Sequence, residues 1–193
     1  MIRIWLAALG AAIAVALALW STAALAQGAW FQHEESGERR AFHRDWMAVC
    51  ADGGEGQCRI LRASADPGSN AFFDQRLTLF RIDNSPDWVL EFMDRDLPAA
   101  DLPELTFDFG STAIVVPGSA LKAGDYAYGG AADSVTLTDP VQVQSILEAM
   151  RAGRALEVRY SPTGQGDGRA TFGLRGVTAA SNAVNAEVLT RQE

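Results

Sequence analysis

Aromatic or β-branched side chains alternate with polar ones in short segments along most of the chain. In 76–82, for example, Leu77 and Leu79 fall on one face of an extended strand, because successive side chains of a strand point to opposite sides. The residues of 83–87 favour a turn, so 76–82 and 88–93 should pair as a hairpin. By the same criteria we expect strands at 45–50, 57–62, 76–82, 88–93, 105–109, 113–116, 134–138, 155–160 and 169–174. The pattern predicts a mostly β, single-domain, antiparallel fold of the β-sandwich type.

One segment has the period of a helix. Asp139 can accept hydrogen bonds from free amides at a helix start, Pro140 suits the first helical position, and Gln142 can close a capping box. Gly153 can end the helix. Apolar residues spaced at i, i+3, i+4 and i+7 form one stripe that should be buried: Val143, Ile146, Leu147 and Met150. We therefore expect one helix, at about 140–152, before the last two strands.

The N-terminal 26 residues have the pattern of a secretory signal peptide. Arg3 precedes an uncharged, mostly aliphatic run from Ile4 to Ala24, and Ala26 supplies the small residue before a cleavage site that would leave Gln27 as the new N-terminus. The alternative is an uncleaved anchor, because the run approaches the ~20 residues that span a bilayer. Either interpretation exports the rest of the chain. We expect a periplasmic or secreted protein that is free of the membrane after cleavage.

Composition divides the remaining chain into three parts. Residues 27–43 are polar and aperiodic apart from Trp30 and Phe31, so we expect a flexible polar leader. Residues 44–186 contain the predicted elements and form the domain, and 187–193 form a C-terminal tail. About 165 residues is the length of one domain and is enough to bury most of its apolar surface.

The charge of the mature chain argues against two classes of partner. Cleavage would remove Arg3 and leave 15 basic and 24 acidic side chains, a net charge of about −9. Nucleic acid and anionic lipid are both repelled by such a protein unless a local basic patch exists. The strongest cluster of basic residues is only Arg39 and Arg40 beside Glu38. We therefore expect no nucleic-acid partner.

Cys50 and Cys58 are the only cysteines, and an even count in an exported protein favours a disulfide bond. The seven residues between them include Gly53, Gly54 and Gly56, so the chain can turn back and bring two strand ends together. A redox pair or a metal site is the alternative. The spacing is not C-x-x-C, however, and no further cysteine completes a thiolate zinc site.

His33 and His43 are the only histidines, and both lie in or beside the polar leader. A catalytic triad needs a base held rigidly against its nucleophile, which a flexible segment does not provide. Neither G-x-S-x-G nor H-E-x-x-H occurs. A metal site made by the two histidines and Glu34 is a minor alternative to solvent-exposed side chains. We therefore expect no catalytic residues and no cofactor.

A run of acidic residues offers hard oxygen ligands of the kind that calcium prefers. Its spacing does not match a calcium-binding loop, and in so acidic a domain such a run is more often a solvated edge. Both interpretations stay open for the run Asp94, Asp96, Asp101, Glu104 and Asp108.

Two further patterns favour a structural role. Gly164–Gly168 is rich in glycine like a phosphate-binding loop, but strand residues follow it where such a loop needs a helix, so a hairpin tip is expected. Trp30, Trp46 and Trp88 should pack in the core, with recognition by an exposed aromatic ring as the lesser alternative.

Two segments together resemble the invasion-associated locus B family. The first is Asp45–Cys50 followed by Gln57–Ile60, which is similar to the "D-W-x-x-x-C … C" opening of that family. The second, 150–158 followed by Phe172–Ala180, is similar to its helix end and its closing "L-x-G-F-x-x-A" strand. Val177 stands where the family usually has Phe, and Arg44 where Gly often precedes the Asp-Trp pair, which indicates a divergent member. The resemblance covers about residues 42–185.

The resemblance implies an exported bacterial β-sandwich with no established catalytic residues, in which only Cys50 and Cys58 carry over, as the disulfide pair. The expected function is non-enzymatic: binding of another envelope or host protein at the cell envelope, with a role in host interaction if the organism has a host. A periplasmic enzyme inhibitor, a small-ligand or metal-binding module and a carboxylate-based hydrolase are the alternatives.

Overall fold

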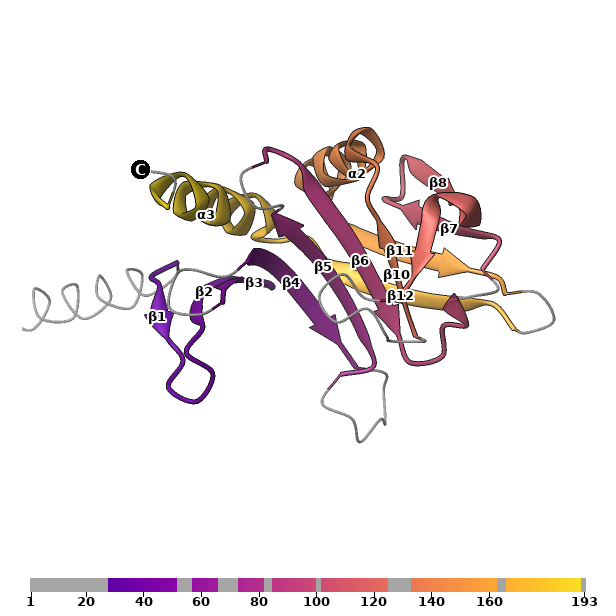
Figure 1. The fold of residues 1–193 in the computed structure, drawn as a ribbon. Coiled ribbons are helices and arrows are strands. Elements are labelled where there is room, and N and C mark those ends of the chain that lie inside the picture. The colour runs from indigo at the N-terminus through magenta and orange to yellow at the C-terminus, as the bar shows by residue number, and fades with distance from the viewer. Residues whose placement is uncertain are drawn as a thin grey trace, which may run out of the picture.

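The computed structural model describes residues 28–51, 57–65, 73–81, 85–99, 102–124, 133–162 and 166–191. These residues form two antiparallel sheets with free edges, so the fold is an open sandwich and not a closed barrel (Figure 1). The larger sheet has the order β1-β2-β3-β4-β5-β6-β10-β9, and the smaller has the order β12-β11-β7-β8. The prediction of a mostly β antiparallel sandwich is confirmed.

The bounds of the elements agree with most of the predicted ranges to within two residues. The eight-stranded sheet contains β1 (Phe31–Gln32), β2 (Arg39–His43), β3 (Trp46–Cys50), β4 (Cys58–Ser64), β5 (Gln75–Arg81), β6 (Trp88–Asp94), β9 (Leu121–Ala123) and β10 (Ser134–Leu137). The four-stranded sheet contains β7 (Glu104–Asp108), β8 (Ala113–Pro117), β11 (Ala155–Tyr160) and β12 (Gly168–Gly173). The helices are α2 (Pro140–Ala152) and α3 (Val177–Thr190), and a short 3-10 turn, η3 (Gly118–Ala120), joins β8 to β9.

The two sheets share one hydrophobic core. Phe92 of β6 packs edge-on against Phe172 of β12, with ring centroids 6.4 Å apart, and thus joins the larger sheet to the smaller. Trp46 and Trp88 are buried as predicted, whereas Trp30 is only partly buried at the edge of the core. Apolar residues from both sheets therefore bury one another, as in other sandwiches.

Helix α2 begins and ends where its sequence predicts. The Asp139 carboxylate accepts a hydrogen bond from the Gln142 amide (2.8 Å), Pro140 is the first helical residue, and the Gly153 amide bonds to the Ala149 carbonyl. The predicted stripe is buried: Val143, Ile146, Leu147 and Met150. The capping box is not closed, however, because the Gln142 Oε1 atom is buried without a hydrogen-bond partner.

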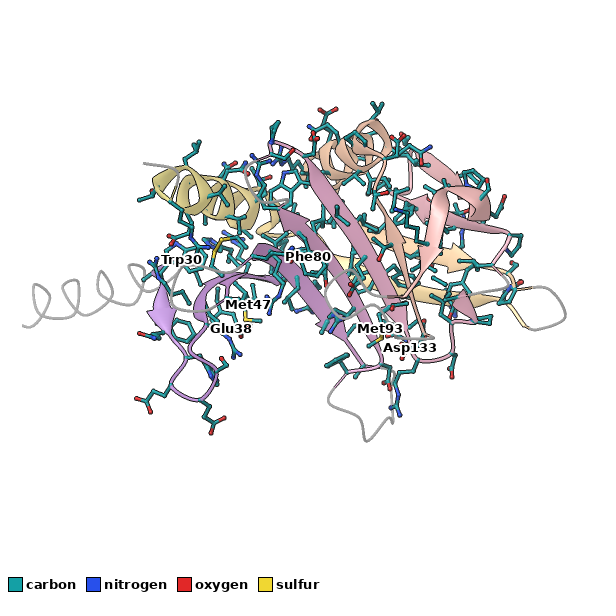
Figure 2. All side chains as sticks on the ribbon, in the orientation of Figure 1. Trp30, Glu38, Met47, Phe80, Met93 and Asp133 are labelled. Atoms are coloured by element: carbon teal, nitrogen blue, oxygen red, sulfur yellow. A yellow bond between two sulfur atoms is a disulfide. The ribbon has the colours of Figure 1, made fainter. Side chains whose placement is uncertain are left out.

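The expectation of a flexible leader at 27–43 is wrong for its described part. Strands β1 and β2 form a hairpin here, and β2 pairs with β3 through five residues. Glu38 receives hydrogen bonds from Arg40 (2.6 Å) and Arg59 (2.6 Å), which tie the hairpin to β4. Figure 2 shows Trp30 beneath α3, where Arg39 stacks on its ring and also pairs with Glu187 of that helix. Ion pairs thus hold this polar segment against the rest of the domain, and composition alone does not reveal such pairs.

The expectations for the C-terminal region also need correction. The closing strand ends at Gly173, and Val177–Thr190 forms helix α3, which the sequence analysis did not predict. Helix α3 packs against β2, β3 and β4, and it extends into the range 187–193 that was expected as a tail. No helix of the described residues is long and apolar enough to cross a bilayer. The proposed cleavage site at Ala26 and Gln27 lies outside the described residues.

Candidate functional site

The outward side of the four-stranded sheet is open to solvent. Along β11, buried Leu156, Val158 and Tyr160 alternate with side chains that point outward. The same alternation holds in the other three strands, so these outward residues form one surface, which we call the open face: Glu104, Thr106, Asp108, Ala113, Val115, Pro117, Ala155, Glu157, Arg159, Arg169 and Thr171. In the eight-stranded sheet, by contrast, the side away from the core includes buried Thr78, Val89 and Glu91.

Two arginines stand side by side on the open face, one on β11 and one on the edge strand β12. Arg159 and Arg169 are direct cross-strand partners on β11 and β12. Arg159 forms an ion pair with Asp108 of β7 (2.7 Å) and a longer one with Glu157 (3.8 Å). Arg169 makes no ion pair or side-chain hydrogen bond with any described residue. One guanidinium is thus neutralised within the sheet, while its neighbour is available to a ligand.

Two adjoining cavities lie at the end of this surface, beside the tip of the β11–β12 hairpin. The first, of about 400 Å³, is lined by Thr106, Arg159, Ser161 and their neighbours. The second, of about 430 Å³, extends to Gln75, Asp94 and Asp96 at the end of the larger sheet. Both cavities share four residues: Tyr160, Asp167, Gly168 and Arg169. Arg169 therefore borders both cavities.

Local sequence explains the walls of these cavities. A Cβ atom on Gly168 would lie 2.0 Å from Cζ of Tyr160, so only glycine leaves room for the Tyr160 ring across β12. Ser161 donates a hydrogen bond to the Asp167 carboxylate (2.7 Å) across the hairpin. The hairpin was predicted, although 163–165 at its tip lie outside the described residues. No sequence pattern pointed to Arg159, Ser161 or Arg169 as site residues.

The residue types that line the cavities are suited to binding charged and hydrogen-bonding groups. They include arginines, carboxylates and hydroxyls, whereas both histidines and both cysteines of the chain lie elsewhere. Displaced pKa values are found at Glu38, His43, Asp45, Arg81 and Arg175. None of these five groups lines either cavity. A histidine base of the triad type is therefore not available here.

The structure joins Cys50 and Cys58 by a disulfide bond. The two residues face each other across β3 and β4, with Cα atoms 4.1 Å apart, and both are buried. The redox-pair and metal-site alternatives find no support in this buried pair.

The other candidate ligands are not brought together. His33 lies in the turn between β1 and β2, whereas His43 ends β2 and its Nε2 atom is buried without a partner. Of the acidic run, Asp94 accepts a hydrogen bond from the Asp96 amide, and Asp108 pairs with Arg159. Asp101 is outside the described residues. Across the described chain, no three such side chains are placed to hold a metal ion.

The two segments that carry the family resemblance touch each other. Trp46 Nε1 donates to the Gly173 carbonyl (2.9 Å), and Arg175 donates two hydrogen bonds to the Asp45 carboxylate (3.0 and 3.2 Å). These bonds from Arg175 lower the pKa of Asp45. We call this contact the clasp, formed by Asp45, Trp46, Gly173, Arg175 and Gly176.

Two glycines of the clasp leave little room for a side chain, and at Gly176 the backbone itself requires glycine. A Cβ atom on Gly173 would lie 2.6 Å from the Asp45 carboxylate, and one on Gly176 would lie 1.8 Å from the His43 carbonyl. Gly176 also has a φ of 98°, which turns the chain into α3. Arg44, where the resembled family often has glycine, has a φ of 60° and is alone among the described non-glycine residues in the left-handed region.

Comparison with known proteins places the fold. No protein-family profile matches the chain, and no curated protein is significantly similar in sequence. The crystal structure of invasion associated protein B from Bartonella henselae aligns with a TM-score of 0.55 at 13% identity, covering 80% of this chain and 99% of that one. The fold is similar to that of invasion associated protein B. At this identity the similarity concerns the fold, and it agrees with the resemblance seen in the sequence.

Proposed function

We propose that this is an exported, non-enzymatic protein of the bacterial envelope, periplasmic or secreted, that binds another envelope or host protein through the open face and its cavities. The observation that carries the proposal is Arg169, which has no ion pair with a described residue and lies where two cavities meet on a solvent-open sheet. The disulfide supports an oxidising compartment, and the signal-like N-terminus supports export. The similarity to a protein named for invasion is compatible with a role in host interaction.

A small-ligand module is the second candidate, because cavities of about 400 and 430 Å³ fall in the size range of small-ligand pockets. Their polar lining points to a charged ligand, with Arg169 available for an anionic group. This alternative predicts stabilisation by a small anion without any protein partner.

Crosslinking in the native envelope, followed by affinity capture, tests the proposal. The wild-type protein should capture one protein reproducibly, R169E should lose it, and R154E should retain it. Arg154 is a matched control because it is exposed, lies outside both cavities and has no ion pair with a described residue. Equal capture by all three proteins would contradict the proposed surface. A thermal shift with a small anion, in the absence of captured protein, would support the small-ligand module instead.

A further inference from the structure

Strand β8 is a free edge of the four-stranded sheet, at the upper right rim of the molecule in Figure 1. The ladder between β7 and β8 continues into a hydrogen bond from the Phe109 amide to the Thr112 carbonyl (2.9 Å). Bonded pairs alternate along an antiparallel ladder, so Ala113 and Val115 occupy the positions whose N–H and C=O groups point away from β7. No described residue accepts or supplies a bond there. The edge therefore presents a ready set of donors and acceptors.

This edge lacks most of the features that protect other sheet edges from pairing. Natural edges carry charged side chains, prolines or bulges. Here the whole range 110–121 contains no charged residue, and Pro117 comes only at the end of the strand. Val115, at the middle, leaves 53% of its surface exposed. Val115 thus presents both an unbonded backbone N–H and C=O and an exposed apolar side chain to a partner.

The neighbouring strand indicates the charge of a suitable partner. Ala113 and Pro117, on either side of Val115, are small or short, and their cross-strand neighbours on β7 are Asp108 and Glu104. Glu104 is exposed and makes no ion pair with a described residue. A strand added beyond β8 would lie about 10 Å from β7, or two strand spacings. A long cationic side chain opposite Pro117 can reach toward Glu104, and one opposite Ala113 can approach Asp108, whose carboxylate also pairs with Arg159.

We propose that the β8 edge binds an extended segment of another protein by strand addition, with an apolar residue opposite Val115 and Lys or Arg two residues to either side. The inference rests on the proposed binding function and names the chemistry of its partner. Strand addition supplies affinity through main-chain bonds and specificity through alternate side chains. A second copy of this chain is a poorer occupant, because its own β8 carries no cation and both copies are acidic.

A labelled peptide of the order Lys-Thr-Val-Thr-Lys, extended by Thr at both ends, tests the edge directly by fluorescence anisotropy with the mature protein. We expect it to bind, and we expect the same peptide with Glu in place of Lys to bind at least tenfold more weakly. V115P should lower its affinity at least tenfold, because proline removes only the outward N–H and leaves the ladder to β7 intact. V115T keeps the N–H and the β-branched shape, so it should bind within about twofold of wild type.

A peptide that is N-methylated at the amides facing β8 cannot donate hydrogen bonds to this edge, so it should bind much more weakly. This measurement uses the wild-type protein and therefore tests the inference even if V115P does not fold. E104Q should weaken binding of the basic peptide by about threefold, the size expected for an exposed charge pair. E148Q, the same change at an exposed position of α2, should have no effect.

Three results would overturn the inference: equal binding by V115P and wild type, binding that survives N-methylation, or concentration-dependent dimerisation that V115P abolishes. The last result would make a second copy the occupant. If V115P still captures the native partner while R169E does not, the proposed function stands and the β8 inference fails. If neither variant changes capture, both fail.

Discussion

The clasp and the open face belong to the same sandwich, yet their polar groups are treated in opposite ways. At the clasp, the Asp45 carboxylate and the Trp46 indole both have partners 127 to 130 residues away in the chain. On the open face, Arg169 and Glu104 have no ion-pair partner among the described residues, and the edge of β8 is unbonded. The polar groups of the clasp stabilise the fold, whereas Arg169, Glu104 and the β8 edge of the open face are left for another molecule, although Arg159 and Asp108 pair within the sheet.

The largest effect should follow from G176A. The left-handed φ of 98° and the approach of a Cβ atom to 1.8 Å from the His43 carbonyl cannot both be relieved without moving β2 or α3. We expect a loss of more than about 3 kcal/mol in the free energy of unfolding, measured by urea denaturation. G110A is the matched control: Gly110 has a φ of 86° with nothing within 4 Å, so the cost should be only about 1 kcal/mol. Equal losses would show that the clasp adds nothing beyond backbone strain.

Removal of the disulfide should have the next largest effect. Replacing Cys50 and Cys58 together by alanine frees a short loop in the unfolded chain and should lower the free energy of unfolding by about 2–3 kcal/mol. Peptide binding at β8 should be unchanged, because both cysteines lie in the other sheet. Differential scanning calorimetry and the anisotropy assay measure the two properties separately. Loss of peptide affinity in a folded double variant would contradict the separation of the two regions.

Acidification should weaken the region around the clasp through His43. Burial lowers the pKa of His43 below its ordinary value of 6.5, and no described residue offers a hydrogen-bond acceptor to its Nε2 atom if it is protonated. The unfolded chain therefore binds the proton first as pH falls. Stability from this group is complete above about pH 6.5 and declines below it until the folded pKa is passed. Unfolding curves between pH 7.5 and 5.5 should show this decline, smaller than the disulfide effect, and H43Q should flatten it. H33Q, in the exposed turn, controls for loss of a histidine.

The sequence predicted those elements that depend on local signals. Strands with alternating burial, such as β11, and the capped helix α2 follow from side chains close together in the chain. The disulfide followed from count and compartment. The β1–β2 hairpin was missed because its order comes from Glu38 meeting Arg59, a contact that a polar composition does not reveal.

Helix α3 and the open face depend on contacts that are distant in sequence. Helix α3 begins after Gly176, which has a left-handed φ and lies so close to the His43 carbonyl of another strand that a Cβ atom would not fit. Arg159 and Arg169 are cross-strand neighbours only because of the register between β11 and β12. That register depends on how many residues form the loop between the two strands, which the sequence pattern does not fix. The alternation at 155–160 predicts which residues point away from the core, but it does not predict whether another element covers that side of the sheet.

A smaller gain in stability should follow from R44G. Arg44 adopts a φ of 60°, which costs a side chain with a Cβ atom about 1 kcal/mol, and glycine avoids that cost. Part of the gain is offset by the greater freedom of glycine in the unfolded chain, so we expect an increase of about 0.5 kcal/mol. R40G, in the extended strand β2, should destabilise instead. Thermal unfolding of the two variants distinguishes relief of strain from a general effect of losing an arginine.

The smallest effect should come from R169T on the open face. Like charges directly opposite each other in a sheet destabilise it, and threonine suits an exposed strand position. Removing Arg169 should therefore raise the free energy of unfolding by about 0.2–0.5 kcal/mol. R159T should give no such gain, because Arg159 also pairs with Asp108. Urea midpoints of the two variants measure the difference. A gain in stability together with lost partner capture would mean that Arg169 is retained for binding at a cost to the fold, whereas a loss of stability would place it among the residues that support the sheet.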